Sequence, residues 1–383
     1  MTERIVAIFS GGGTGGHLYP ALALAGALVE RRPDVRPFFI GAERGVEARV
    51  LPDRGVEHLL VPVEGARRSA LLGNLRVIRC LGSALAQVAE TFHRLRPRLV
   101  VVTGGYAGGP AGLVAVLTRT RLVLQEQNSV PGLTTRVLSL FAREVHLAFP
   151  EAVAVLPRSS RGKARISGNP VRPPVPVKRE DAALAFGLDP SAPVVLVVGG
   201  SQGSEALNAS VLESVTGVVE GRIEWGPETQ ILWGTGPTHF VRIQAALATL
   251  GSPAWVHALG YIDEMPLALA ATDLAVSRAG AMATSEFLAW GIPAILIPLP
   301  TAAADHQTRN AEALREAGAA LHLRQSEATG AILWDAVRGL LSNPEGRERM
   351  ARAARERGRP AAVHEIARAL DALLPSPLAE VAR

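Results

Sequence analysis

Short runs of consecutive apolar residues alternate along this chain with longer segments in which apolar residues recur every three or four positions. The short runs are typical of strands buried on both faces of a parallel sheet, and the longer segments are typical of the amphipathic helices that cover it. The pattern therefore predicts an α/β fold. We expect strands at residues 5–9, 37–40, 58–61, 99–102, 122–124 and 144–148, and then at 193–198, 230–233, 254–259, 274–277, 294–298 and 320–322.

The alternation breaks at residues 169–176, where four of the eight residues are proline. Proline disrupts helices and cannot donate a hydrogen bond in a central strand, so this segment predicts a stiff linker. We therefore expect two domains, at residues 1–170 and 177–358. The helical pattern of residues 344–374 breaks near Gly358 and Pro360. The last part, residues 359–375, either returns to the first domain or caps the second.

Both expected domains open with the same plan, an apolar strand followed by a glycine-rich turn and a helix. The turns are Gly11–His17 and Gly199–Gly203, and the helices are expected at residues 20–28 and near 207–215. Backbone N–H groups of such turns approach anions closely, and a helix N-terminus adds positive potential. Ligands of open α/β sheets bind beyond the carboxyl ends of the strands, so we expect a phosphate-bearing ligand in a cleft between the domains.

A dinucleotide and a purely structural turn are the alternatives for the first turn. Gly11, Gly13 and Gly16 have the G-x-G-x-x-G spacing. The acidic residue expected at the end of the next strand is missing, because Glu43 comes late and follows Gly41.

Four further loops at predicted strand ends carry polar or glycine-rich sequences: 103–110, 125–128, 277–286 and 305–310. In the third, we expect Ala281 to Ser285 to present free N–H groups at a helix start and Glu286 to lie in the first turn, an arrangement that suits a diphosphate and a ribose. Tight turns, capping, dipole compensation and solvation are the structural alternatives for these loops.

Composition and charge narrow the class of protein that this chain can belong to. The pI is about 10.1, but the net charge is only +5 and only two of the 40 basic residues are lysines, so the high pI reflects a small arginine excess. The sequence has no stripe of basic residues interleaved with aromatic ones, so it does not indicate nucleic-acid binding. Cys80 alone forms neither an intrachain disulfide nor a cysteine metal cluster. We expect no signal peptide and no membrane span.

Six motifs occur in one order along the chain: Gly11–His17, Gly104–Tyr106, Glu126–Asn128, Gly168–Arg172, Gly199–Gly203 and Thr284–Glu286. With these motifs the chain resembles the MurG family of peptidoglycan glycosyltransferases. The resemblance implies the GT-B architecture, two Rossmann-like domains with parallel sheets that face each other across a cleft. It also implies an inverting transfer of N-acetylglucosamine from UDP-GlcNAc to the C4 hydroxyl of the muramyl sugar in a lipid-linked muramyl-pentapeptide, at the cytoplasmic face of the bacterial membrane.

The same resemblance implies roles for individual residues. Glu286 would bind the ribose, Ala281, Met282, Ala283, Thr284 and Ser285 the diphosphate, Ile262 the uracil, and Gln307 with Asn128 the sugar. Arg172, Ser201, Gln202 and Thr14, Gly15 and Gly16 would complete the donor site, and Gly104, Gly105 and Tyr106 would bind the acceptor. His306 stands where some relatives carry a second glutamine, which leaves Gln307 for the sugar.

Inverting transfer needs a general base and a group that stabilises the departing UDP. His17 is the preferred base because imidazole titrates near neutral pH, and Glu126 is the reserve candidate. The structural alternative is that His17 caps the turn or holds an acceptor phosphate. No Asp-x-Asp motif follows a predicted strand, so we expect no metal or other cofactor, and helix N-termini with Arg172 to meet the leaving-group charge.

A lipid acceptor requires contact with a membrane. Residues 66–79 mix leucines and isoleucine with arginines, which predicts docking on an anionic surface, although an ordinary amphipathic helix with its leucines in the core explains the pattern as well. The expected contacts are Arg67, Arg68, Leu71, Leu72, Leu75, Arg76, Ile78 and Arg79. Other cell-wall synthesis proteins are further candidate partners, whereas nucleic acid is not expected.

Two other functions remain open for this chain. A UDP-GlcNAc epimerase would share the architecture and the donor site but would have no use for a lipid-docking patch. A non-catalytic nucleotide-sugar binding module would keep Glu286 and the glycine loops and tolerate the loss of His17.

Overall fold

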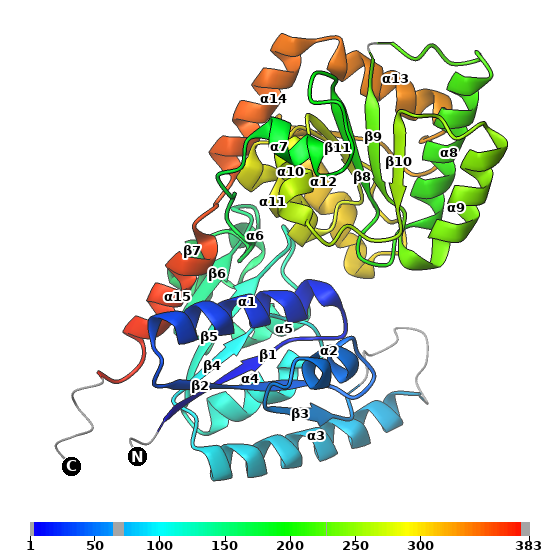
Figure 1. Cartoon of the computed structure of the whole chain (residues 1–383). Helices are drawn as coiled ribbons and strands as arrows, with labels where there is room; N and C mark the ends of the chain where they lie inside the picture. The colour runs from blue at the N-terminus through cyan, green and yellow to red at the C-terminus, as the bar shows by residue number, and fades with distance from the viewer. Residues whose placement is uncertain (1–3, 64–72, 227, 377–383) are drawn as a thin grey trace. The chain divides into compact units, whose positions relative to one another are not determined.

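The computed structural model describes residues 4–63, 73–226 and 228–376 and divides the chain into two units (Figure 1). Unit 1 comprises residues 1–171 and 361–383, and unit 2 comprises residues 172–360. The chain passes from unit 1 to unit 2 within the proline-rich segment 169–176, which has no helix or strand.

Unit 1 alternates strands and helices along the sequence. Its elements are β1 (Ile5–Ser10), α1 (Gly15–Arg31), β2 (Val35–Ala42), α2 (Glu47–Asp53), β3 (His58–Val61), α3 (Gly73–Leu95), β4 (Leu99–Val102), α4 (Gly108–Leu117), β5 (Arg121–Glu126), α5 (Leu133–Leu138), β6 (Glu144–Leu147), α6 (Ala152–Val155), the 3-10 helix η1 (Arg158–Lys163), β7 (Ala164–Ile166) and α15 (Ala362–Ala372).

The strands of unit 1 form one parallel sheet in the order β3-β2-β1-β4-β5-β6-β7. Side chains on the two opposite faces of β1 pack into two different hydrophobic cores. Ile8 packs with residues of α3, α4 and α5, whereas Phe9 packs with residues of α1 and α15. The edge strand β7 was not predicted, because Ala164–Ile166 is short and contains Arg165.

Helix α1 begins five residues before the predicted start at Pro20, so that prediction was wrong. Thr14 has extended backbone angles and occupies the N-cap position, and the first turn is built from Gly15, Gly16 and His17. Pro20 lies inside the helix. The N-terminus of α1 therefore lies within the glycine-rich turn itself.

The C-terminal helix α15 packs against α1 in unit 1 (Figure 1). Ile366 and Leu370 are fully buried in the core that α1 contributes to. Asp371 accepts hydrogen bonds from Arg31 at 2.7 Å and from Arg32 at 2.9 Å. The last helix in the sequence thus completes the first core of the chain.

Unit 2 repeats the plan. Its elements are α7 (Arg179–Leu184), β8 (Val194–Val198), α8 (Glu205–Val219), β9 (Gln230–Gly234), α9 (Pro237–Thr249), β10 (Val256–Leu259), α10 (Met265–Ala271), β11 (Leu274–Ser277), α11 (Ala281–Trp290), β12 (Ala294–Leu296), the 3-10 helix η2 (Ala303–Asp305), α12 (His306–Glu316), β13 (Ala320–His322), α13 (Gly330–Leu341) and α14 (Pro344–Arg357).

The strands of unit 2 form a second parallel sheet in the order β10-β9-β8-β11-β12-β13. In each sheet the strand order reverses once, between β1 and β4 in unit 1 and between β8 and β11 in unit 2. Loops that leave the carboxyl ends of these strands diverge to opposite faces and open a crevice, the usual ligand site of such sheets. The loops after β1, β4, β8 and β11 all carry motifs found in the sequence.

We predict that Ile366→Ala lowers the free energy of unfolding by about 2–5 kcal/mol, because the side chain is fully buried and its loss leaves a cavity between α15 and α1. Urea denaturation followed by circular dichroism measures the change. The matched control is Ile166→Ala in the same unit, where a side chain that is 36% exposed should contribute less than about 1 kcal/mol. Equal losses in the two variants would contradict docking of α15.

Candidate active site

In unit 1, the loops after β1 and β4 meet around the imidazole of His17. The backbone of Gly105 approaches so closely that a Cβ there would lie 2.1 Å from the carbonyl oxygen of Gly12 and 3.0 Å from Cδ2 of His17. Gly105 also has a φ of +72°, which favours glycine. The Tyr106 ring lies against Gly13 in the same way. The structure therefore brings His17, Gly104, Gly105 and Tyr106 together.

The His17 ring is held by hydrogen bonds at one of its two nitrogens. Nδ1 lies 3.0 Å from the backbone oxygen of Thr103 and 2.8 Å from Oε1 of Gln127. The Thr103 hydroxyl donates to the backbone oxygen of His17 at 2.7 Å. The imidazole is thus fixed at the N-terminus of α1, next to Thr14, Gly15 and Gly16, and it is half-buried.

Glu126 uses both carboxylate oxygens to organise the loop that follows β5. Oε1 accepts from the backbone N–H of Asn128 at 3.2 Å and from its side-chain amide at 3.3 Å. Oε2 accepts from the N–H of Gly132 at 3.1 Å and from the Thr135 hydroxyl at 2.6 Å. The carboxylate is buried and orients Asn128, so its observed contacts are those of a structural group.

In unit 2, the N-terminus of α11 differs in two details from the sequence-based expectation. Because Gly280 is extended, the first bond within the helix runs from the N–H of Thr284 to Gly280. Thr284 therefore has no free N–H group, and the candidate donors for an anion are those of Met282 and Ala283 in the first turn. Glu286 lies in the second turn rather than the first, so dipole compensation does not explain it.

Glu286 has an unusual electrostatic environment. Burial raises the pKa of its carboxyl group from 4.5 to about 7, and the nearby Arg172 guanidinium only partly opposes this shift. Arg172 itself is exposed and lies at the beginning of unit 2. A carboxyl group with a pKa near neutrality and a cation close by are typical of functional sites.

The remaining donor-site candidates of unit 2 follow other strands of the same sheet. Ile262 is buried after β10, and its side chain packs against Gly234 at the end of β9. Oε1 of Gln307 accepts a hydrogen bond from the N–H of Leu299 at 2.9 Å. This bond fixes the side chain and turns its amide nitrogen away from Leu299. Ser201 and Gln202 are exposed in the loop after β8. Thr14, Gly15, Gly16 and Asn128 belong to unit 1 instead.

Arg278 helps to build this site and was not predicted from the sequence. Its buried guanidinium donates to the Ser204 hydroxyl at 2.9 Å, to the backbone oxygens of Ile297 and Pro298 at 3.0 and 3.1 Å, and to Oε1 of Gln325 at 2.7 Å. Burial lowers its pKa. It joins the loops after β8, β11, β12 and β13. An arginine directly after the apolar strand 274–277 was the available signal.

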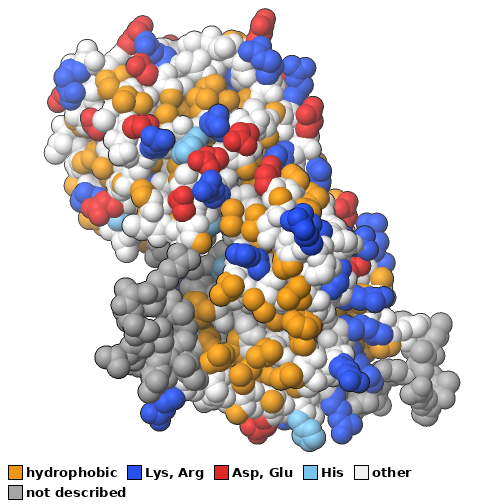
Figure 2. Space-filling view, turned by 180° about the vertical axis from the view of Figure 1, so that it is seen from behind, with side chains coloured by type: hydrophobic (Ala, Val, Ile, Leu, Met, Phe, Trp, Pro, Cys, Tyr) orange, Lys and Arg blue, Asp and Glu red, His pale blue; other side chains and the backbone are white. Residues whose placement is uncertain are grey.

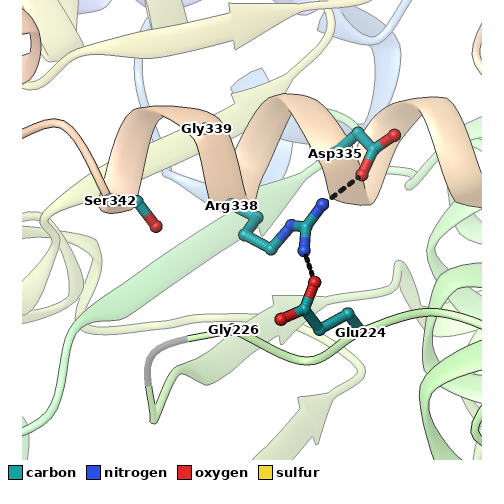
Figure 3. A pocket seen from close by; sticks show the side chains of 6 residues that line it. All are labelled: Glu224, Gly226, Asp335, Arg338, Gly339 and Ser342. Carbon is teal, nitrogen blue, oxygen red and sulfur yellow. Dashed lines mark hydrogen bonds and ion pairs between the residues drawn. The ribbon is translucent and has the colours of Figure 1, made fainter.

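A hollow on unit 2 is formed by other residues of this unit. It is lined by Glu224, Gly226, Asp335, Arg338, Gly339 and Ser342 (Figure 3). Arg338 pairs with Glu224 and, at 3.1 Å, with Asp335, so its charge is compensated. Residues 224–226 precede β9, so the hollow lies toward the amino ends of the strands, where α/β sheets seldom bind ligands.

Most of the predicted membrane contacts lie outside what the structure describes. Arg67, Arg68, Leu71 and Leu72 are not among the described residues, and Leu75, Arg76 and Ile78 are placed only as members of α3, where Arg79 is exposed. Among the described residues, no helix has the length and apolar character needed to cross a membrane. Nor does the described part of the chain contain a group of three or more His, Cys, Asp or Glu residues that could hold a metal ion.

Comparisons with known proteins identify the class. Residues 7–147 match the glycosyltransferase family 28 N-terminal domain, and residues 194–366 match the C-terminal domain of the same family. The crystal structure of MurG from Acinetobacter baumannii superposes with a TM-score of 0.74 at 27% identity and covers 96% of this chain and 100% of that one. The fold and the matched domains are those of a GT-B glycosyltransferase.

The curated relatives narrow the identification. The UDP-N-acetylglucosamine--N-acetylmuramyl-(pentapeptide) pyrophosphoryl-undecaprenol N-acetylglucosamine transferase of Desulfitobacterium hafniense is 39% identical over 364 residues, which are 94% of this chain and 96% of that protein. The chain belongs to the MurG family. The UDP-GlcNAc 2-epimerase of Neisseria meningitidis matches with a TM-score of 0.61 at 13% identity and covers 96% of this chain and 100% of that one, a likeness of fold alone.

We predict that Glu286→Gln stabilises unit 2 at pH 8 more than at pH 5.5. The folded-state pKa of about 7 exceeds the usual 4.5, so ionisation of the carboxyl group opposes folding increasingly as the pH rises through this range. Glutamine removes that opposition. Thermal unfolding at the two pH values measures the difference, and the exposed Glu264→Gln serves as the control. A gain that is the same at both pH values would exclude this origin.

Proposed function

We propose that this enzyme transfers N-acetylglucosamine from UDP-GlcNAc to the C4 hydroxyl of the muramyl sugar in a lipid-linked muramyl-pentapeptide, with inversion at the anomeric carbon. The observation that carries the proposal is the 39% identity, over 94% of the chain, to a protein named as an N-acetylglucosamine transferase for this lipid-linked acceptor. The fixed imidazole in unit 1 and the carboxyl group beside an N-terminus in unit 2 support it.

The donor nucleotide is proposed to bind unit 2. The N–H groups at the start of α11 suit the diphosphate, Glu286 accepts hydrogen bonds from ribose hydroxyls, and the backbone at Ile262 contacts the uracil. Gln307 is oriented by Leu299 so that its amide nitrogen can donate to the sugar. Ser201, Gln202 and Arg172 complete the polar surroundings of the phosphates. In this proposal the donor also contacts Thr14, Gly15, Gly16 and Asn128 of unit 1.

The acceptor is proposed to bind the loops of unit 1 that contain Gly104, Gly105 and Tyr106. Nε2 of His17 removes the proton of the attacking hydroxyl as the bond from C1 to UDP breaks, and the resulting oxygen nucleophile forms the new glycosidic bond. UDP leaves with the bonding electron pair. General-base catalysis of this kind contributes about 10²–10⁴-fold to the rate. Glu126, whose oxygens already accept four hydrogen bonds, is the less suitable base.

The negative charge that develops on the leaving diphosphate needs stabilisation. Arg172 and the α11 N-terminus are proposed to supply it as fixed positive groups that need no reorganisation during the reaction. The proposed mechanism uses no cofactor or tightly bound metal.

The acceptor's lipid requires an approach to a membrane, and unit 1 has an apolar surface suited to it. We call it the α4–α5 face; its exposed members are Leu113, Leu117, Leu133, Val137, Leu140 and Phe141. Figure 2 shows hydrophobic side chains gathered on this side of unit 1, bordered by basic ones. Arg119, Arg121, Arg136 and Arg143 are exposed nearby in the sequence. Apolar groups with an arginine border suit peripheral docking on anionic lipid at the cytoplasmic side.

The helical spacing of Leu113 with Leu117, and of Leu133 with Val137 and Phe141, was the sequence signal for this face. This spacing is the same as that of a helix face buried in a core, so only the exposure of the side chains distinguishes a docking surface from a core face. In this proposal the α4–α5 face adds to the contacts proposed at residues 67–79. Other cell-wall synthesis proteins are proposed as partners at the membrane.

The first test measures UDP release from UDP-GlcNAc with and without a short-chain lipid-linked muramyl-pentapeptide. We expect release only with the acceptor. In the same assay His17→Ala should lower kcat at least about 100-fold while UDP binding, measured by calorimetry, stays unchanged. Acceptor-independent release would indicate the epimerase, and no turnover under either condition would favour a binding module.

The membrane proposal is tested by flotation with vesicles that contain anionic lipid. Leu117 and Leu133 are 73% and 75% exposed, so replacing both by serine should leave the fold intact and weaken vesicle binding about 10-fold or more. The control is Val241→Ser on α9 of unit 2, which is 76% exposed and should change nothing. Undiminished binding of the double variant would contradict docking through the α4–α5 face.

A further inference from the structure

Gln127 is a buried amide directly after β5, only 1% exposed, in contact with the proposed base. Its nitrogen Nε2 lies 2.8 Å from the backbone oxygen of Thr103 and 3.2 Å from that of Gln125. Backbone oxygens only accept hydrogen bonds, so the nitrogen end of the amide must face them. The oxygen end is thereby turned toward His17.

The same reasoning fixes the proton on the imidazole. Nδ1 of His17 lies between two acceptors, Oε1 of Gln127 at 2.8 Å and the backbone oxygen of Thr103 at 3.0 Å. A nitrogen between two acceptors must carry the hydrogen, which leaves the lone pair of the neutral ring on Nε2. Within the described part of the chain, Nε2 has no hydrogen-bond partner.

Neighbouring groups hold Gln127 in this orientation. Asn169 donates to the backbone oxygen of Gln127 at 3.1 Å and accepts from the side chain of Gln125 at 2.9 Å. Oε1 of Gln125 accepts from the Gln127 amide nitrogen. The three side chains are each at least 98% buried and satisfy one another, so an alternative orientation would leave buried polar groups without partners.

We propose that Gln127 is a positioning residue that keeps the proton of neutral His17 on Nδ1, so that Nε2 is the atom that receives the proton of the acceptor hydroxyl. This inference rests on the proposed function. Gln127 does not touch the substrate in this scheme; it selects the tautomer and the ring orientation. Asn169 of the Gly168–Arg172 motif is thereby linked to the base through the buried network of Gln125 and Gln127.

The direct test reads the tautomer of His17 by two-bond proton–nitrogen NMR on the full chain labelled with ¹⁵N-histidine at alkaline pH. The His17→Ala variant assigns its signals among the nine histidines. We expect the wild-type proton on Nδ1. A proton on Nε2 would overturn the proposal, and this result is independent of enzyme activity. Failure of acceptor-dependent UDP release would instead count against the proposed function.

The kinetic test compares Gln127→Met with Gln125→Met, two changes of equal chemistry in the same buried network. Gln127→Met removes one of the two acceptors at Nδ1 and leaves the backbone oxygen of Thr103, so we expect the tautomers to mix rather than invert. This should lower kcat about 10-fold, with a smaller change in KM for UDP-GlcNAc. Gln125→Met removes one acceptor of the Gln127 amide but keeps the two backbone oxygens that hold it, so it should keep the Nδ1 proton and most of kcat. Equal losses in both variants with an unchanged His17 tautomer would show a merely structural role.

If Gln127→Met does not fold, two measurements still test the proposal: the His17 tautomer of the wild-type protein and the behaviour of Gln127→Glu. Glutamate retains an oxygen beside Nδ1, and in its protonated form the second oxygen can replace the amide nitrogen as the donor to the backbone oxygen of Thr103, so the Nδ1 proton on the neutral ring should be preserved. Where this carboxyl group ionises it stabilises the imidazolium, so the acidic limb of the rate profile should also move to higher pH. An unmoved profile together with a proton on Nε2 would overturn the proposal.

Discussion

The parallel direction of every paired strand is the constraint on which the rest of this structure depends. It sends all carboxyl ends within a unit to one edge and requires a helical crossover after each strand. The single reversal of strand order in each sheet then separates two adjacent crossovers. Glycine-rich or polar loops lie at those reversals in both units, so the chemistry collects there rather than at the hollow beside Arg338.

The two units use this constraint differently. In unit 1, glycine backbones pack against an imidazole, and a buried amide network orients the ring. In unit 2, a helix N-terminus lies near a carboxyl group whose pKa is about 7, and the buried Arg278 joins four loops. One arrangement suits removal of a proton, and the other suits binding of a nucleotide diphosphate. The proposed division between acceptor and donor follows from these local chemistries.

Several structural features were predictable because they depend on near neighbours. Short, mostly apolar runs identified twelve strands, and four prolines identified the segment between the units. Local patterns failed where a short or irregular segment depends on its surroundings. The edge strand β7 contains an arginine, α1 starts within glycines that have little intrinsic helical preference, and Glu286 entered the second turn because Gly280 is extended.

The sequence by itself determined the class of fold, the family and most of the loops that carry the candidate site, because strand periodicity and glycine motifs are local properties. Only the tertiary structure decided that Gln127 contacts His17, 110 residues away in the sequence. It also decided that the Glu126 carboxylate accepts hydrogen bonds from the loop that follows it, and that α15 packs in the core of unit 1. These outcomes depend on which distant groups share a buried space. Hydrogen-bond satisfaction and burial are set by that neighbourhood, which periodicity along the chain does not encode.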